Sequence, residues 1–284
     1  MNQRKELFIA MQRLLPKHAL SRLIGRVAES RILWLKNFLI SRAIDHFGIN
    51  MDEAEIRNID NYENFNAFFT RSLKTNARPV ASGENTICSP ADGVISQAGM
   101  ITKSRILQAK GIEYSVDCLV GDDMAATNFY DGSFATIYLS PKDYHRVHMP
   151  VSGRLIKTRY IPGDLFSVNE TTAKGVNGLF RRNERLVCEF KSDVLGDFVI
   201  ILVGAILVAG IQTVWSGFET PGRGDVRETN FLDNYLYFDK GAEIGQFRFG
   251  STAIILFRKD TISTLSNLYP QKSVLMGEQI ATAL

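Results

Sequence analysis

The spacing of apolar residues changes near Ile87, and this change constrains the fold of the 284-residue chain more than any other feature. Before Ile87, apolar residues recur at helical spacing. After it, short apolar runs alternate with glycine-containing turns, which is the pattern of strands. The pattern predicts an α+β protein in which a β-rich core follows an N-terminal helical region. We place the helical region at residues 1–73 and the β-rich domain at residues 74–284.

The first 47 residues are predicted to form helices that are interrupted at Pro16, with Gly25 as a second candidate break. The last of these helices runs from about Ile32 to Phe47 and is the richest in large apolar residues. A further helix is predicted within residues 51–73, with Asp52 as its cap and aromatic residues at helical spacing that face the core.

Several short segments after Ile87 have the apolar runs and flanking turns of strands. They are Gly93–Gln97, Ser133–Leu139, Gly153–Ile161, Arg185–Phe190, Asp197–Leu202, Ile206–Trp215 and Ala253–Phe257. The apolar run from Phe198 to Ala209 is interrupted by Gly204, so we interpret it as two buried strands. A membrane span would need about 20 apolar residues in a row. The polar stretch 221–234 is predicted to be a loop.

Positive charge is concentrated in the first 45 residues, which carry nine Lys/Arg and three acidic residues. Their net charge is +6, so the remaining chain carries −3 of the total charge of +3. Basic helices with apolar faces are typical of helices that lie in a membrane interface, where Lys and Arg meet anionic headgroups. The sequence leaves open the alternative of a helical layer packed on the core. Apart from this charge, we find no nucleic-acid-binding pattern.

The three cysteines, Cys88, Cys118 and Cys188, are widely spaced and form no CxxC pair. The spacing therefore predicts neither a disulfide framework nor a zinc site, and a reducing compartment is the simplest interpretation. The first residues also lack the architecture of a signal peptide.

A glycine–serine pair, Gly250-Ser251, stands directly before the predicted buried strand Ala253–Phe257. Phe247 and Phe249 before it are predicted to share one face of extended chain. Glycine weakens a strand unless the backbone must bend or be approached closely. By itself, the pair is therefore typical of a β-bulge.

Three other stretches place polar residues in turns: Asp92-Gly93, the segment with His145 and His148, and Gly163–Asn169. The His-x-x-His spacing is compatible with a metal pair, but no carboxylate or cysteine cluster accompanies it. A base with a helper is the better interpretation, because histidine titrates near neutral pH. Each histidine alone could equally be a hydrogen-bonded loop residue.

An aspartate, a histidine and a serine first suggest a serine hydrolase that uses Asp92, His148 and Ser251. Against this reading, the sequence lacks the Gly-x-Ser-x-Gly elbow, and Ser251 precedes a buried strand that is poorly placed to receive an external acyl group. The position suits attack on the carbonyl of Gly250, because a glycine peptide can distort and has no Cβ to block the approach.

Taken together, these motifs resemble the phosphatidylserine decarboxylase family of pyruvoyl enzymes, in family order from about residue 60 to 257. The matching segments are Phe65-Asn66 with Phe68-Phe69 and Arg71, Pro90–Gly93, Ile106–Gly111, Tyr144–Pro150, Pro162–Asn169, Asn183–Arg185 and Gly250–Thr252. Each segment is weak alone, whereas the set is highly specific. Phe249 departs from the leucine that is common in the family, which should leave the cleavage chemistry intact but could alter the shape of the pocket.

The resemblance implies a proenzyme that cuts itself between Gly250 and Ser251 into a β-chain, residues 1–250, and an α-chain, residues 251–284. It implies that His148 removes the hydroxyl proton of Ser251 and that Asp92 orients His148. Ser251 then attacks the Gly250 carbonyl to form an ester. Elimination and loss of ammonia convert Ser251 into a covalent pyruvoyl group, the pyruvate cofactor.

The same resemblance implies the conversion of phosphatidylserine to phosphatidylethanolamine and CO2. The pyruvoyl ketone would form a Schiff base with the substrate amine and accept the electrons of decarboxylation, and His145 is a candidate proton donor. Residues 1–47 would dock the protein on an anionic membrane, peripherally, on the cytoplasmic side of the cell membrane. The two chains would form a heterodimer that assembles further as a dimer, with no metal and no nucleic acid.

Two other classes make different predictions. A serine hydrolase predicts an intact chain in which a fluorophosphonate labels Ser251. A peripheral membrane-binding protein without catalysis predicts lipid binding, an intact chain and no carbonyl group.

Overall fold

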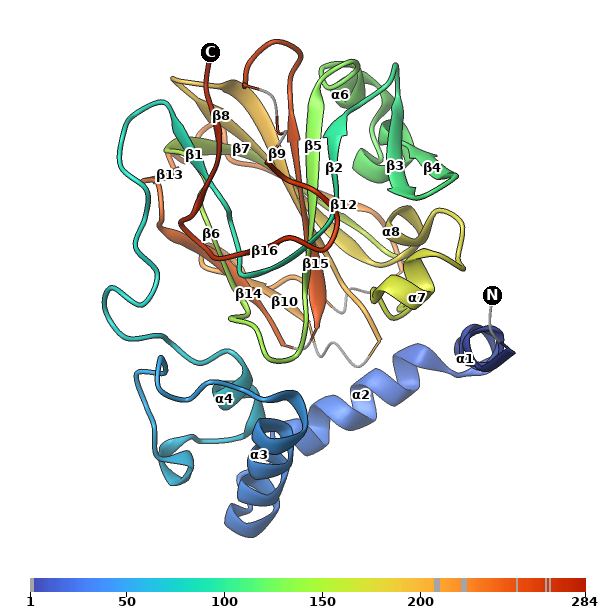
Figure 1. The fold of residues 1–284 in the computed structure, drawn as a ribbon, viewed down its shortest axis with the longest axis vertical. Coiled ribbons are helices and arrows are strands. Elements are labelled where there is room, and N and C mark those ends of the chain that lie inside the picture. The colour runs from blue at the N-terminus through green and yellow to red at the C-terminus, as the bar shows by residue number, and fades with distance from the viewer. Residues whose placement is uncertain (1–2, 207–209, 221–223, 249, 264, 266) are drawn as a thin grey trace.

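The computed structural model describes residues 3–206, 210–220, 224–248, 250–263, 265 and 267–284. Helices dominate the first part of the chain and strands the rest, which confirms the predicted α+β class (Figure 1). The helices are α1 (Gln3–Leu14), α2 (Lys17–Ala28), α3 (Leu33–Phe47), α4 (Phe65–Phe69), α5 (Val116–Val120), α6 (Asp123–Thr127), α7 (Glu170–Ala173) and α8 (Leu179–Arg182), with a 3-10 turn at Ile59–Asn61. None of the helices in the described ranges is long and apolar enough to cross a membrane.

A nine-stranded antiparallel sheet forms the centre of the molecule, in the order β12-β7-β8-β9-β15-β5-β2-β16, and β13 also pairs with β7. Its strands are β2 (Gly93–Met100), β5 (Ser133–Leu139), β7 (Gly153–Ile161), β8 (Arg185–Ser192), β9 (Gly196–Val203), β12 (Arg227–Asn230), β13 (Tyr237–Phe238), β15 (Ser251–Phe257) and β16 (Ser273–Val274). A smaller sheet has the order β11-β10-β14-β6, with β6 (Arg146–His148), β10 (Ile211–Thr213), β11 (Gly217–Phe218) and β14 (Glu243–Phe247). The remaining pairs are β1 (Thr86–Cys88) with β17 (Gln279–Thr282), and β3 (Arg105–Ala109) with β4 (Ile112–Ser115).

Strand β15 lies in the interior of the large sheet and is buried on both faces. It pairs with β5 on one side and β9 on the other. Ala253 and Ile255 belong to the apolar cluster that includes residues of the small sheet, whereas Ile254 and Leu256 belong to the cluster beneath β3, β4 and the short helices. A strand covered on both faces reads as a continuous apolar run, which is why its sequence could be recognised.

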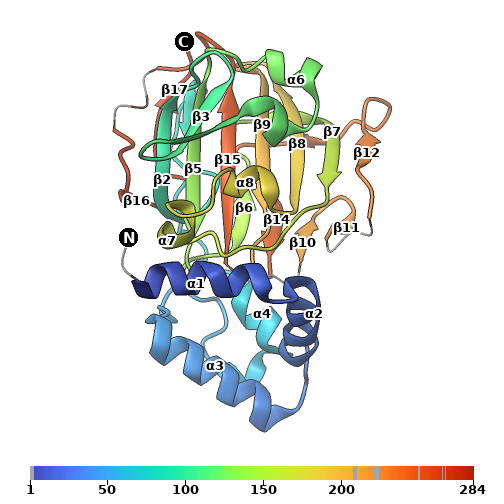
Figure 2. The same ribbon diagram turned by 90° about the vertical axis from the view of Figure 1, so that its right-hand side faces the viewer.

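The N-terminal helices form a layer at the end of the sheet where β15 begins (Figure 2). α3 and α4 pack on each other in a small apolar cluster of their own, and Ile9 of α1 joins the cluster of the main domain. α3 ends at Gly48, whose φ of 66° is the left-handed conformation that glycine adopts at little cost. α2 continues through Gly25, so the second candidate break was wrong.

The helix predicted within residues 51–73 was mostly wrong. Only the 3-10 turn and α4 are helical there, and Ala54 forms a bridge with Leu73. The side chains of Asn58 and Asn64 accept backbone N–H groups, from Asp60 and Ala67 respectively, where Asp52 was expected to cap. Such local hydrogen bonds compete with helix continuation, and the aromatic spacing alone could not reveal them.

The predicted strands are confirmed with small shifts, except for Ile206–Trp215, which is reduced to β10 (Ile211–Thr213). Residues 207–209 of that prediction lie outside the described residues. The predicted loop 221–234 contains β12, which pairs with β7 along an exposed edge. Edge strands of this kind are polar and short, so they carry little of the apolar signal used to find strands.

Candidate active site

Ser251 is the first residue of β15 and faces the interior. It is paired with Leu139 of β5, its exposed fraction is 0%, and its hydroxyl has no hydrogen-bond partner among the described residues. The register is regular from Ser251 to Phe257, so β15 itself contains no β-bulge. A buried hydroxyl without a partner costs about 1–3 kcal/mol. The fold itself gives no reason for a serine at this position.

Gly250 is equally unexplained by the fold. It is not among the glycines with positive φ, and an added Cβ would meet only the Leu139 carbonyl oxygen, at 3.6 Å. A larger residue would therefore fit at position 250. Gly93 is different, because a Cβ there would overlap the carbonyl of Tyr138. Gly93 is a packing glycine, whereas the glycine at 250 must be explained by chemistry. Phe249 lies outside the described residues.

The loop that leaves Leu139, residues 140–145, lies beside this glycine–serine pair. The carboxylate of Asp143 accepts hydrogen bonds from the backbone N–H and hydroxyl of Ser140, both at 2.7 Å. At the other end of the loop, the carbonyl of His145 accepts the N–H of Phe247 at 2.9 Å. The loop therefore connects the strands on both sides of Gly250.

His145 is completely buried within this loop. Its Nδ1 lies 2.8 Å from the Asp143 carbonyl, which can only accept, so Nδ1 carries the proton. Nε2 is then an acceptor, and it has no partner among the described residues. Burial lowers the pKa of His145 to about 3. At neutral pH the free nitrogen can take up a proton but has none to donate, so the predicted donor role requires prior protonation of Nε2.

His148 lies at the end of β6 and is also held neutral. Its Nδ1–H donates to the Gly241 carbonyl at 2.8 Å, and its Nε2 accepts the hydroxyl of Tyr144 at 3.1 Å. Burial lowers the pKa of His148 below its usual value and raises the pKa of Tyr144 to about 12. His148 is therefore a neutral base whose Nε2 lone pair already accepts a hydrogen bond from the Tyr144 hydroxyl.

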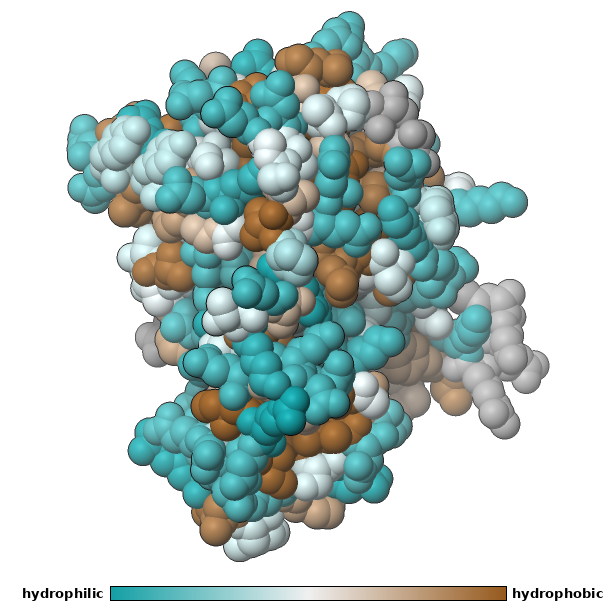
Figure 3. All heavy atoms as spheres, turned by 60° about the vertical axis from the view of Figure 1, so that its left-hand side comes forward, coloured by the Kyte–Doolittle hydropathy of each residue, from teal (hydrophilic) through white to brown (hydrophobic). Residues whose placement is uncertain are grey.

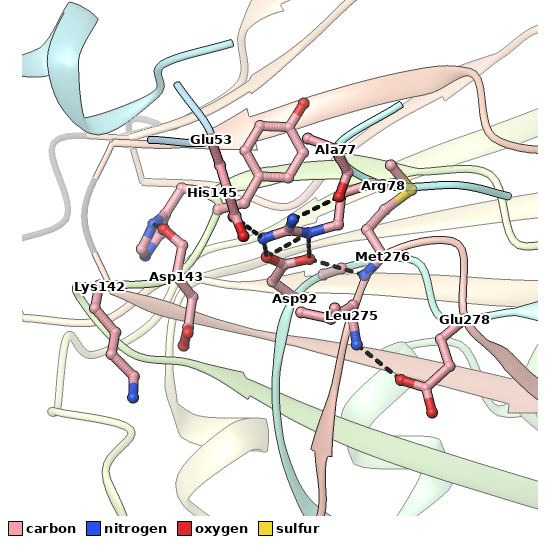
Figure 4. Close-up of polar contacts among 12 residues, drawn as sticks. Glu53, Ala77, Arg78, Asp92, Lys142, Asp143, His145, Leu275, Met276 and Glu278 are labelled. Atoms are coloured by element: carbon pink, nitrogen blue, oxygen red, sulfur yellow. Dashed lines mark hydrogen bonds and ion pairs between the residues drawn. The ribbon is translucent and has the colours of Figure 1, made fainter. Parts of the chain in front are cut away.

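Asp92 is held mainly by Arg78 (Figure 4). The Arg78 guanidinium donates from Nε at 2.9 Å and from Nη2 at 2.6 Å, and the N–H of Met276 adds a third donor at 2.8 Å. Arg78 also donates to Glu53 at 2.8 Å, so the N-terminal region contributes to the same network. Nothing that the structure describes joins Asp92 to His148 by a direct hydrogen bond. The predicted orientation of His148 by Asp92 thus remains a prediction.

Sequence reasoning missed Arg78 and Tyr144. Tyr144 entered only as the first residue of the matching segment Tyr144–Pro150, and no motif included Arg78. For Tyr144 the available signal was its position directly before His145. Within the described residues, no group of three or more His, Cys, Asp and Glu side chains could hold a metal ion.

The segment Gly163–Asn169 forms contacts with the N-terminal helices. Lys17 of α2 pairs with Asp164 at 3.0 Å and lies 3.7 Å from the centre of the Phe166 ring, and Gln12 accepts the N–H of Ser167 at 2.8 Å. The end of the segment, Val168-Asn169, lines a pocket of about 640 Å³ together with Tyr138, the register partner of Thr252. The segment therefore connects the helical layer to the region around β15.

The buried histidines predict a loss of stability in acid. Because the pKa of His145 is about 3 in the folded protein and about 6.5 when unfolded, the unfolded chain binds a proton that the folded chain does not between these values. Stability from this group is present above pH 6.5 and is lost as the pH falls. In an uncut Ser251→Ala background, moving from pH 7 to pH 5 should remove about 2 kcal/mol of unfolding free energy through His145.

Urea unfolding of a His145→Asn variant measures this contribution, because the asparagine amide can still donate to the Asp143 carbonyl but does not titrate. The pH dependence should weaken by that amount relative to the Ser251→Ala parent. An equal pH dependence in the two proteins would contradict the assignment.

The fold and site define a class: an α+β protein with a buried, unpartnered serine after a glycine that the fold does not require, beside two neutral histidines. Comparison with known proteins identifies the family to which the chain belongs. The family model described as phosphatidylserine decarboxylase matches residues 65–282, and a model described as PSD matches residues 7–48. The chain belongs to the phosphatidylserine decarboxylase family.

Relatives match the chain over nearly its whole length. It is 50% identical over 277 residues to the phosphatidylserine decarboxylase proenzyme of Alcanivorax borkumensis, covering 96% of this chain and 95% of the relative. It is 48% identical over 278 residues to the proenzyme of the same name from Saccharophagus degradans, covering 97% of each chain. A third relative with this name, from Pseudomonas fluorescens, is 46% identical over 285 residues, covering 99% of each.

Proposed function

We propose that this chain is a self-cleaving proenzyme that converts phosphatidylserine to phosphatidylethanolamine and CO2, and that the cleaved bond joins Gly250 to Ser251. The observation that carries the proposal is the buried, unpartnered hydroxyl of Ser251 next to a glycine that sterics do not demand. Membership of the family supports the reaction, and the relatives' printed names, which call them proenzymes, support the processing.

In the proposed cleavage, the Oγ of Ser251 attacks the carbonyl carbon of Gly250 while its proton leaves toward His148. The C–N bond breaks, and the chain is joined through an ester. Elimination at residue 251 then releases Gly250 with a free carboxylate and leaves a dehydroalanine. Water replaces its nitrogen, which departs as ammonia, and residue 251 becomes a pyruvoyl group.

The residues present fit such a group. The first position of β15 is buried and fixed by pairing with Leu139 of β5, and His145, at the far end of the loop that follows Leu139, has an acceptor Nε2 without a partner among the described residues. Once formed, the pyruvoyl group supplies an electron sink for decarboxylation. The residues of the chain would hold the substrate, exclude water and move protons around it.

His148 is proposed as the base because burial keeps it neutral at pH 7 and its unprotonated Nε2 carries a lone pair. The Tyr144 hydroxyl now donates to that lone pair. Proton uptake by His148 therefore requires that Tyr144 either passes a proton on or gives up this hydrogen bond. Asp92 is proposed to help stabilise the protonated form. Burial lowers the pKa of His148 most, and the negative charges of Glu243 and, to a smaller extent, Asp92 raise it.

The two products of cleavage are proposed to stay together as a heterodimer. The α-chain, residues 251–284, would begin with β15, which is paired over its whole length with β5 and over six residues with β9, both from the β-chain. The α-chain also contributes β16 and β17 to pairs with β2 and β1. Separation would break all of these pairings.

Denaturing mass spectrometry tests the proposal. It should find two chains, one ending at Gly250 and one beginning at a blocked, hydrazide-reactive residue 251. The purified protein should also release CO2 from phosphatidylserine. An intact chain with a fluorophosphonate-labelled serine would instead indicate a hydrolase, and an intact, unlabelled chain without a carbonyl group would indicate a lipid-binding protein.

We also propose that the N-terminal helices dock the protein on an anionic membrane surface. Large apolar side chains are exposed on them, and Figure 3 shows apolar patches among polar ones at this end of the molecule. They include Leu7, Met11, Leu23, Leu33, Trp34 and Phe38, with exposed fractions of 53–72%. Two of the basic residues point inward, since Lys17 pairs with Asp164 and Lys36 donates to the Ile59 carbonyl at 2.8 Å. Arg31 pairs with Glu63, whereas Lys5, Arg13, Arg22, Arg26 and Arg42 are exposed and available for headgroups.

Replacing Leu33, Trp34 and Phe38 by serine should lower binding to phosphatidylserine vesicles at least about tenfold, because each side chain would lose an apolar contact worth more than about 1 kcal/mol. Vesicle flotation measures the loss. Met124→Ser is the matched control, since Met124 is 85% exposed on α6 in the other domain. Point substitutions are preferable to truncation, because Ile9 and Gln12 contact the catalytic domain. Undiminished flotation of the triple variant would refute the docking surface.

A further inference from the structure

Three arginines are buried among the described residues, and one of them differs from the other two. Arg71, Arg159 and Arg185 are exposed by only 4%, 3% and 3%. Removing a guanidinium from water is costly unless its charge or its N–H groups find partners. How each arginine is compensated therefore indicates what it does.

Arg159 and Arg185 are fully compensated within the chain. Arg159 forms ion pairs with Asp122 and Glu228. Arg185 has no carboxylate partner, but it donates to four backbone carbonyls, those of Leu119, Arg181, Asn183 and Cys118, at distances of 2.6–3.0 Å. Both are structural arginines whose donors are used by the fold.

Within the part of the chain that the structure describes, Arg71 makes a single hydrogen bond, from Nη2 to the carbonyl of Lys142 at 3.1 Å. Its Nε and Nη1 are buried and have no hydrogen-bond partner, and no described carboxylate lies within ion-pairing distance. The ring of Phe68, 5.7 Å away, offers only a weak cation–π contact. Burial accordingly lowers the pKa of Arg71. Burying this cation with so few partners therefore lowers the stability of the folded protein.

Arg71 lies against residues 140–145, the loop between β5 and β6, which we call the catalytic loop. Lys142, its hydrogen-bond partner, lies in the loop that runs from the register partner of Ser251 to His145. The neighbouring Phe69 ring is 4.1 Å from the His145 ring, centre to centre, and the charge of Arg71 contributes to the low pKa of His145. The unpartnered donors of Arg71 and the unpartnered acceptor Nε2 of His145 thus belong to the surroundings of one loop, which begins after the register partner of Ser251.

We infer that Arg71 is a substrate-binding residue whose free Nε–H and Nη1–H receive an anionic oxygen group of the headgroup. The inference rests on the proposed function, since it assigns a subsite within the same site. A guanidinium presents two parallel donors that match a carboxylate or a phosphodiester. The headgroup of phosphatidylserine carries both groups, and the chemistry of Arg71 is shared by the two.

Arg71 and Ser251 are both buried in the continuous chain, with exposed fractions of 4% and 0%. The loop that holds Lys142, residues 140–145, is bonded at one end to Phe247 and follows, at the other end, Leu139, which pairs with Ser251. Cleavage between Gly250 and Ser251 separates these two attachments, so that the loop is no longer held between joined strands.

The test compares wild-type protein, Arg71→Met, Arg71→Lys and Arg57→Met in mixed micelles of detergent and phosphatidylserine. Methionine keeps the length and apolar stem of arginine without its charge. Arg57 is the control for loss of a cation from the same region, since its side chain is 59% exposed and pairs only with Asp52 in this structure. Three quantities are measured on each protein: the extent of self-cleavage, KM and kcat for phosphatidylserine, and inhibition by phosphatidylethanolamine.

Arg71→Met should cut itself and show a KM raised by about 10- to 100-fold, the loss expected for a charged hydrogen bond, with a smaller change in kcat. Arg71→Lys should recover part of this loss, and Arg57→Met should behave as wild type. Phosphatidylethanolamine has the phosphodiester but lacks the carboxylate. If its inhibition constant is unchanged in Arg71→Met, Arg71 binds the carboxylate. If it rises together with KM, Arg71 binds the phosphodiester.

A wild-type KM in a fully cut Arg71→Met protein would overturn the inference. Loss of self-cleavage in both Arg71→Met and Arg71→Lys would overturn it as well, because Arg71 would then serve folding or processing. Failure of the proposed function gives a different result, since the cut wild-type protein itself would then release no CO2.

Discussion

Ser251→Ala is expected to abolish self-cleavage while leaving the fold as stable as before or more so. The two effects separate because the Ser251 hydroxyl is buried and makes no hydrogen bond among the described residues. Removing an unsatisfied buried hydroxyl relieves a desolvation cost of about 1–3 kcal/mol, whereas removing the nucleophile leaves no oxygen to attack Gly250. The variant should remain a single chain of 284 residues without a carbonyl group or decarboxylase activity.

Mass spectrometry and urea unfolding of the same preparation measure both effects. Thr136→Val is the matched control. Thr136 lies on the adjacent strand β5, is 1% exposed, and also has an unpartnered hydroxyl. It should gain stability in the same way but cut normally. A Ser251→Ala chain that still splits would exclude Ser251 as the nucleophile, and a strongly destabilised one would attribute the loss of cleavage to misfolding.

The core of the fold could be predicted because burial on both faces produces a signal in the sequence. β15, β9 and β5 are continuous apolar runs, and their bounds follow the sequence closely. The region 51–73 could not be predicted in this way. Its aromatic residues are buried by contacts with α3 and with His145, and the side chains of Asn58 and Asn64 cap the N-termini of its two short helical segments. The aromatic spacing identified burial and α4 correctly, but it did not show that most of the region is not helical.

In the candidate site, too, some features can be recognised from short sequence motifs, whereas others arise only when folding brings distant residues together. Gly250, Ser251 and the two histidines stand in short motifs and could be named from the sequence. The state of those histidines could not, because it depends on their burial in the fold and, for His148, on the carbonyl of Gly241, which is distant in sequence. The role of Arg71 is still harder to predict from the sequence, because it is inferred from two buried N–H groups that lack hydrogen-bond partners among the described residues.

The Asp92–Arg78 pair carries the second large expected effect. The two side chains are exposed by only 4% and 9%, and three hydrogen bonds from Arg78 and one from Met276 fill the carboxylate. Asp92→Asn or Arg78→Met should each destabilise the uncut Ser251→Ala chain by about 3–5 kcal/mol, because each leaves a buried charge without its partner. In chains that keep Ser251, Asp92→Asn should also slow self-cleavage by at least about 100-fold, the contribution typical of acid–base catalysis.

The double variant separates the structural role of Asp92 from the catalytic one. Removing both charges leaves neither of them uncompensated, so Asp92→Asn with Arg78→Met should recover most of the lost unfolding free energy, as a double-mutant cycle would measure. Self-cleavage should not recover, because the charge that stabilises protonated His148 is still missing. Recovery of cleavage together with stability would mean that Asp92 acts only through the fold. The base would then be His148 with Tyr144 alone, and the aspartate would serve to hold Arg78 and, through Glu53, the N-terminal region against the site.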